Sequence, residues 1–257
     1  MIRALPIALT LLLATAPLAF AQSLGLGAGH VELGHTDMDQ GPDQLDGRLL
    51  MDFTISAHHG IEARAALEDT MLGTAGTVAG VAYMRPTNGL RYGLFGSLSD
   101  LDGEAASWGY VGAAGIWAVS DGVSLGAHGA IGRRVTGPRA GGRLSEPDTL
   151  MGGIDLFARL SEQLSATAAL SVAEFDEWQF RATASELRAG LVYHLPRSPL
   201  GLRAEMIHDR LDGPNGAAAH THLRLGLFVR FGAQPAASEM RPFVLSDPIG
   251  QLTRRGL

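Results

Sequence analysis

The strongest constraint on this chain is an alternation of apolar and polar residues with a period of two, which recurs in segment after segment. In residues 45–58 the odd positions carry Leu, Gly, Met, Phe, Ile or Ala, whereas all but one of the even positions carry Asp, Arg, Thr, Ser or His. Successive side chains of a β-strand point to opposite faces, so this segment forms a strand with one apolar and one polar face. Every such apolar face needs an apolar environment.

The same alternation predicts further strands along most of the chain. It is found at 61–68, 90–98, 123–134, 150–160, 164–172, 187–195, 200–206 and 223–231. Three other segments, at 25–35, 77–85 and 104–119, are small and apolar on both faces, so the register of these strands stays open. The total is about twelve strands, and an even number allows a closed barrel with both chain ends on one side.

The turn that follows the last of these three segments offers two alternatives. A two-residue turn at 121–122 would direct Trp108, Tyr110 and Ile116 to the apolar outer face. A three-residue turn would reverse the face, because a shift of one residue moves every side chain to the other side of the sheet.

The connections between the expected strands alternate between short and long. The short ones are 58–60, 86–89, 120–122, 161–163 and 196–199, and the mostly longer ones are 37–44, 69–76, 100–103, 136–148, 174–183 and 212–217. Barrels of the bacterial outer membrane have short periplasmic turns and longer extracellular loops. A soluble sandwich gives no reason for this sorting.

The N-terminus has the features of an export signal. Arg3 provides a positive start, residues 4–18 are largely apolar, and Ala19-Phe20-Ala21 matches a cleavage site of the A-x-A type. We therefore expect a signal peptide at 1–21. After residue 21 no apolar stretch approaches the roughly 20 residues that a spanning helix needs, so a mature chain inserted in a membrane would cross it as strands.

Charge and cysteine content exclude several other classes. The formal net charge is −6, which argues against nucleic acid as a partner because phosphate binding requires a basic surface. The chain has no cysteine and therefore neither a disulfide framework nor a thiolate nucleophile.

Over residues 24–231 the chain resembles the outer-membrane β-barrel proteins of Gram-negative bacteria, the porin-like class. Residues 223–231, with the sequence LRLGLFVRF, are similar to the closing strand of that class, which ends in an aromatic residue and is read by the assembly machinery. The resemblance implies an all-β fold: a closed antiparallel transmembrane β-barrel of about twelve strands with meander topology. It also implies a location in the cell outer membrane, with outer-membrane lipid and, during biogenesis, the barrel assembly machinery as partners.

The chain departs from this class at its C-terminus. The closing aromatic is usually the last residue, whereas here residues 232–257 follow Phe231. We therefore divide the chain into a signal peptide at 1–21, a transmembrane barrel at 22–231, and a tail at 232–257 that is either periplasmic or a plug in the lumen.

The polar faces of the strands predict which residues line a pore. These are Asp46, Arg48, Asp52, Glu62, Arg64, His128, Arg134, Asp155, Arg159, Arg188, His194, Arg203, Glu205, His222, Arg224 and Arg230. Both signs of charge occur. Strand pairing places Arg64 near Asp52 and Glu205 near Arg188, where ion pairs can form. The excess of Arg on the last strands favours anionic solutes.

The expected function is a small porin-like passive channel for polar solutes. The alternatives are a closed structural or surface barrel with a periplasmic interaction tail, and a lipid-modifying outer-membrane enzyme. The enzyme is disfavoured because the outward faces of the clear strands carry no Ser–His pair, and Ser171 and His128 can meet only in the lumen. We assign no catalytic residue and no cofactor. His58-His59 and His220-x-His222 lack an assignable third ligand, so we also assign no metal site.

Overall fold

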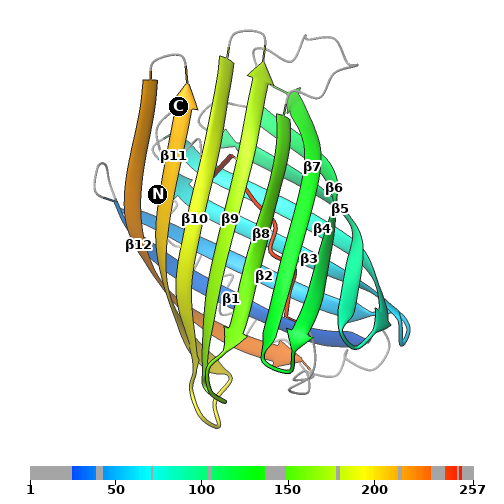
Figure 1. The fold of residues 1–257 in the computed structure, drawn as a ribbon. Coiled ribbons are helices and arrows are strands. Elements are labelled where there is room, and N and C mark those ends of the chain that lie inside the picture. Colours follow the sequence, from blue (N-terminus) through cyan, green and yellow to red (C-terminus); the bar gives the residue numbers. More distant parts are fainter. Residues whose placement is uncertain are drawn as a thin grey trace.

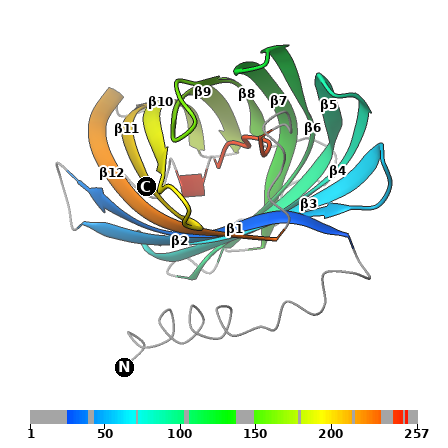
Figure 2. The ribbon, with the colours of Figure 1, turned by 90° about the horizontal axis from the view of Figure 1, so that it is seen from below.

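The computed structural model describes residues 25–38, 43–70, 72–102, 106–136, 149–177, 180–213, 216–232, 241–247 and 249–250. It is a closed barrel of twelve strands in which each strand pairs antiparallel with its neighbours in the chain (Figures 1 and 2). The strands are β1 (Leu26–Asp37), β2 (Gln44–Thr54), β3 (His59–Thr70), β4 (Gly73–Thr87), β5 (Leu90–Leu101), β6 (Ala106–Ser120), β7 (Val123–Thr136), β8 (Thr149–Arg159), β9 (Leu164–Glu177), β10 (Phe180–His194), β11 (Leu200–Gly213) and β12 (Gly216–Gly232). The predicted all-β meander barrel is confirmed.

The alternation in the sequence becomes the two faces of the barrel wall. The apolar positions point outward, where Leu45 is 61% and Leu94 is 71% exposed. Their neighbours in the sequence point inward, as Asp46 and Phe95 do, and both of these are buried. A monomeric soluble protein rarely exposes so large a continuous apolar surface, so this outer face is suited to hydrocarbon. Within the described ranges, no helix is long and apolar enough to cross a membrane.

Pairing of β1 with β12 closes the barrel. Their register runs from Ala28↔Gly232 to Asp37↔Leu223, and β1 pairs on its other edge with β2. The register of β1, which the sequence left open, is thereby fixed from both sides. From Glu32 to Asp37 its even positions are buried and its odd positions, such as Leu33, are exposed.

A two-residue turn after β6 is expected to direct its large side chains outward, and the structure corrects this orientation. The turn itself is as expected, since Ser120 pairs with Val123. A register shift between Ala118 and Ser120 then inserts one extra residue into β6. Such a bulge moves the preceding side chains to the opposite face. Trp108, Tyr110 and Ile116 are consequently buried on the inner side, and the outward assignment is wrong.

The connections are sorted at the two ends of the barrel, but several are shorter than expected. The strands extend into the segments assigned to long loops: β9 ends at Glu177 and β10 begins at Phe180, while β11 ends at Gly213 and β12 begins at Gly216. Strands of 11 to 17 residues exceed the usual spanning length of about 9–11 residues, so the wall is taller than the sequence suggested. The expected signal peptide and the loop at 137–148 lie outside the described residues.

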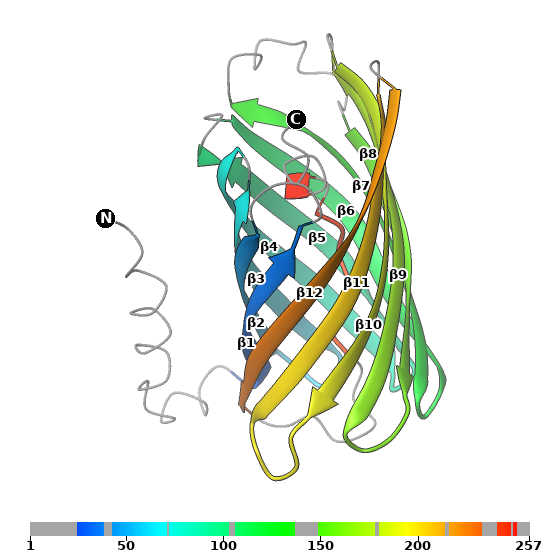
Figure 3. The same ribbon diagram turned by 90° about the vertical axis from the view of Figure 1, so that its left-hand side faces the viewer.

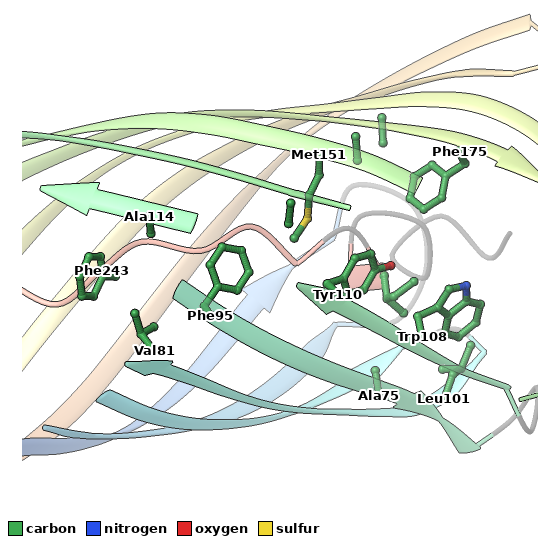
Figure 4. Packing of buried hydrophobic residues seen from close by; sticks show 14 of the residues in the cluster. Ala75, Val81, Phe95, Leu101, Trp108, Tyr110, Ala114, Met151, Phe175 and Phe243 are labelled. Atoms are coloured by element: carbon green, nitrogen blue, oxygen red, sulfur yellow. The ribbon is translucent and has the colours of Figure 1, made fainter. Parts of the chain in front are cut away.

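The inner wall is not polar throughout. On β4 to β9 the buried positions are largely apolar and include Val81, Phe95, Tyr110, Met151 and Phe175 (Figure 4). The polar interior predicted from the alternation is therefore concentrated on the remaining strands and at particular points of this apolar half.

The bulge in β6 generates a prediction about two tryptophans. Trp117 is 60% exposed on the outer face, whereas Trp108 is 5% exposed inside. Two variants that each keep one of these tryptophans, with the other two of the three in the chain replaced by Phe, would be reconstituted in liposomes with brominated acyl chains. Fluorescence of Trp117 should be strongly quenched and that of Trp108 little changed. Equal quenching of both would show that the register of β6 is different.

Candidate functional site

The candidate site is the inner wall of the barrel, where the polar faces of the strands converge. Of the residues expected to line a pore, the buried ones are Asp46, Glu62, Asp155, Glu205, His222 and Arg224. The half-buried ones are Arg48, Asp52, Arg64, His128, Arg134, Arg188, His194, Arg203 and Arg230, and Arg159 is exposed at the end of β8. That these residues line a conducting pore stays a prediction.

Arg224 is the centre of a charge cluster beside the closing strands. Its side chain is 1% exposed. Its guanidinium lies 2.5 Å from Glu32 Oε1, 2.6 Å from Asp46 Oδ2 and 3.0 Å from Glu205 Oε2. These carboxylates come from β1, β2 and β11, so one side chain of β12 connects four consecutive strands. A charge buried to this degree requires such partners.

Two further guanidiniums complete this cluster, which we call the seam cluster. Arg203 Nε donates to Glu32 Oε2 at 3.0 Å and its Nη1 lies 3.5 Å from Glu205. Arg48 Nε lies 3.1 Å from Asp46. The carboxylates and guanidiniums of the cluster are therefore balanced.

Arg188 has a partner that the sequence did not indicate. Its Nε lies 2.5 Å from Glu186 on its own strand, while Glu205 forms ion pairs with Arg203 and Arg224. The acidic partners of β1, β2 and β10 thus offset the charges of Arg188, Arg203 and Arg224, which weakens the reason for favouring anionic solutes.

Glycines make room for the seam cluster. Gly34 and Gly226 lie opposite each other across the β1–β12 pair. A Cβ at Gly34 would lie 2.3 Å from Nη2 of Arg224, and a Cβ at Gly226 would lie 2.8 Å from Oε1 of Glu32. The charged side chains therefore lie close against bare backbone at the seam.

A second group of charges lies on β2 to β5. The Arg91 guanidinium is 2.5 Å from Glu62 and 3.2 Å from Asp52. The Tyr83 hydroxyl donates to Asp52 at 2.7 Å, and Arg91 lies 4.2 Å from the centroid of the Tyr83 ring. Arg64 pairs with Glu62 rather than with Asp52 as expected, because Asp52 is held by Arg91 and Tyr83.

Sequence reasoning missed four of these inner residues, Glu32, Tyr83, Arg91 and Glu186. Arg91 had a signal, because it alternates with apolar neighbours in a clear strand. Glu32 and Tyr83 lie in the two segments that are apolar on both faces, where the sequence offers no alternation to read. Only pairing with neighbouring strands reveals their orientation.

Part of the C-terminal tail lies inside the barrel. We call residues 241–247 and 249–250 the tail segment; Figures 1 to 3 show it running within the ring of strands. It begins near the short-turn end, where Arg241 contacts Ser124 just after the 121–122 turn, and continues to Asp247, which accepts a hydrogen bond from Thr77 at 3.3 Å. Figure 4 shows Phe243 facing the inner wall together with Val81 and Ala114.

Hydrogen bonds tie the tail segment to several strands. Arg241 Nε donates to Ser124 Oγ at 2.9 Å, and its Nη2 donates to Asp155. The backbone N–H of Phe243 donates to Glu62 at 3.3 Å, and its carbonyl accepts from Arg64. These wall residues belong to β3, β7 and β8, so the segment bridges separate parts of the wall.

The histidines raise the question of a metal site and, through Ser171 and His128, of a catalytic pair in the lumen. No group of three or more His, Asp or Glu side chains that could hold a metal is found there. Ser171 and His128 lie on either side of Gly153 on the inner wall. Nε2 of His128 is 2.6 Å from Ser246 Oγ, and its Nδ1 has no hydrogen-bond partner among the described residues. No described carboxylate therefore orients this imidazole.

The seam cluster predicts an effect on stability. Arg224→Met removes the shared partner of three buried carboxylates. We expect it to lower the free energy of unfolding by about 3–5 kcal/mol, the usual effect of breaking a buried ion pair from one side. The measurement is denaturant unfolding in detergent micelles. Arg210→Met, which breaks the exposed pair with Asp212, should leave the midpoint unchanged, and equal effects of both would refute the role of the cluster.

No protein-family model and no curated protein sequence matches this chain. Among solved structures, the NanC porin matches with a TM-score of 0.58 at 10% identity, over 78% of this chain and 98% of the porin. An outer-membrane channel from Pseudomonas putida F1 matches with a TM-score of 0.58 at 15% identity, over 84% of this chain and 100% of the channel. The KdgM porin, also solved in complex with disordered oligogalacturonate, matches with a TM-score of 0.54 at 11% identity, over 79% and 99%. The chain therefore shares its closed-barrel fold with outer-membrane porins and channels.

Proposed function

We propose that this protein is an outer-membrane barrel that acts as a small porin-like passive channel for polar solutes. The observation that carries the proposal is the opposite chemistry of the two faces of one closed wall. Large apolar side chains such as Leu94 and Leu125 are exposed outside, whereas buried charges such as Glu62 and Arg224 lie inside. Hydrocarbon can cover the first face, and water with small polar solutes can occupy the second.

The fold similarity and the expected signal peptide support the outer membrane as the location. Closed barrels are the form in which strands cross a membrane, because all their backbone groups are paired within the wall. The solved structures named above are porins and an outer-membrane channel. This favours transport over lipid modification for the same fold.

A closed barrel is the second candidate function, and a specific observation favours it. The tail segment occupies part of the lumen and bonds to the wall on β3, β4, β7 and β8. A permanently fixed tail would make the protein a scaffold.

If the protein is a channel, it should give single-channel currents. Purified full-length protein in a planar lipid bilayer should give discrete conductance steps in KCl. Because the seam cluster is balanced, the reversal potential in a KCl gradient should stay close to zero. The absence of steps from both the full chain and a variant with a weakened tail contact would refute the channel.

Arg230 provides a test of which face the solute meets. It lies near the end of β12, half-buried, and its Nε has no hydrogen-bond partner in the described part of the chain. We expect Arg230→Glu to shift the reversal potential toward cation selectivity, because it reverses a charge beside the permeation path. Arg210→Glu, an exposed position on β11, is the matched control and should cause no shift. Equal shifts from the two variants would contradict an inner path.

A further inference from the structure

The inner wall of β3, β4, β7 and β8 contains a site whose occupant is the tail segment of the same chain. Asp155 is 6% exposed, and its carboxylate accepts from Arg241, while Ser124 accepts from the same guanidinium at 2.9 Å. On the opposite side of the lumen, Glu62 and Arg64 hold the backbone of Phe243. In the strand order β3 and β8 are separated by four strands, so the segment spans the lumen.

Glycines in the wall accommodate the side chains that hold the tail segment. A Cβ at Gly126 would lie 2.4 Å from Oδ1 of Asp155, and a Cβ at Gly153 would lie 2.5 Å from Cε1 of His128. Asp155 binds Arg241, and His128 Nε2 accepts from the backbone N–H of Ser246 at 3.2 Å. The absence of a Cβ at Gly126 and Gly153 therefore leaves room for the two wall side chains that bind the tail segment.

Apolar packing adds to these polar contacts. Phe243 is 3% and Ile249 is 1% exposed, and both belong to the buried apolar cluster, most of which lies on β4 to β9. The Arg91 guanidinium lies 4.3 Å from the centroid of the Phe243 ring, on which it can form a cation–π contact. Without the tail segment, this part of the apolar inner wall would face water.

The exit of the chain from β12 allows the tail to turn into the lumen. Gly232, the last residue of β12, has a φ of 86°, a left-handed conformation that glycine adopts without the steric cost of a Cβ. It directly follows Phe231, the aromatic residue of the closing strand. The wall is therefore complete before the tail begins.

We propose that the tail segment is a tethered plug, and that the barrel conducts polar solutes only when Arg241 has left Asp155 and Ser124. This inference rests on the proposed channel function and adds its regulation. Release leaves Asp155 as a buried carboxylate without the one guanidinium that pairs with it among the described residues. A solute or peptide carrying a guanidinium has the chemistry to replace Arg241 there.

The first test is conductance of full-length variants. Asp155→Asn removes the charge of the carboxylate at nearly the same side-chain size. Arg241→Gln removes the guanidinium. Loss of a charge-assisted hydrogen bond should raise the open probability by about ten- to a hundredfold. The double variant should add little to Arg241→Gln alone, because that substitution already removes both contacts of the guanidinium, with Asp155 and with Ser124. Glu186→Gln, which removes a buried inner carboxylate that pairs with Arg188 on the same strand, is the matched control and should leave the open probability unchanged.

The second test locks the plug in place. The chain has no native cysteine, so Thr77→Cys with Asp247→Cys, two positions whose side-chain oxygens lie 3.3 Å apart, can be joined by oxidation or by a short bifunctional thiol reagent. The locked protein should open less often than its reduced form, and reduction of the disulfide should restore the currents. Resistance of the folded barrel to SDS before heating verifies that each variant is assembled.

The outcomes separate the two proposals. If no variant conducts, including Asp155→Asn, the channel itself is refuted. If all variants and the locked protein conduct as the unmodified chain does, the channel stands and the plug is refuted. If a synthetic peptide carrying residues 233–257 blocks Asp155→Asn as strongly as it blocks Arg241→Gln, the assigned role of Asp155 in binding Arg241 is refuted.

Discussion

Closure of the sheet by β1 and β12 is the constraint on which the rest of the structure depends. In hydrocarbon, no water is available to pair with the backbone groups of an edge strand, so a spanning sheet must be continuous around its circumference. The register from Ala28↔Gly232 to Asp37↔Leu223 achieves this. It also decides which side chains of β1 enter the lumen, because β1 has no clear alternation of its own.

The same seam holds the most buried charges. Arg224 lies where β12 meets β1, and its carboxylate partners come from the strands on both sides. Glycines at 34 and 226 allow these side chains to lie close to the backbone. Sheet closure and charge pairing are therefore interdependent: the ion pairs require the strands to be in this register, and they stabilise the pair that completes the barrel.

The lumen is divided chemically into a charged part at the seam and an apolar part along β4 to β9. The tail segment lies against the apolar part, which gives a physical reason for its position: Phe243 and Ile249 cover surface that would otherwise meet water. Its polar groups use the few charged or hydrogen-bonding wall residues there, such as Asp155 on β8, together with Glu62 on the adjacent β3. A barrel with a uniformly charged interior would offer a peptide no such combination.

The sequence by itself determined the strands, the two faces of those that alternate clearly, and the closed barrel, because a period of two is a local property that each segment carries independently of its partners. It also located most of the inner charges, including Arg224 and Asp155. It did not determine the orientation of Trp108 and Tyr110, which a single-residue bulge reverses, nor the partners of Arg64 and Arg188. The sequence also did not determine whether the tail lies in the periplasm or in the lumen. Only the tertiary structure decided these features, because ion pairs and plug contacts join residues far apart in the chain, and their geometry exists only after the barrel has closed.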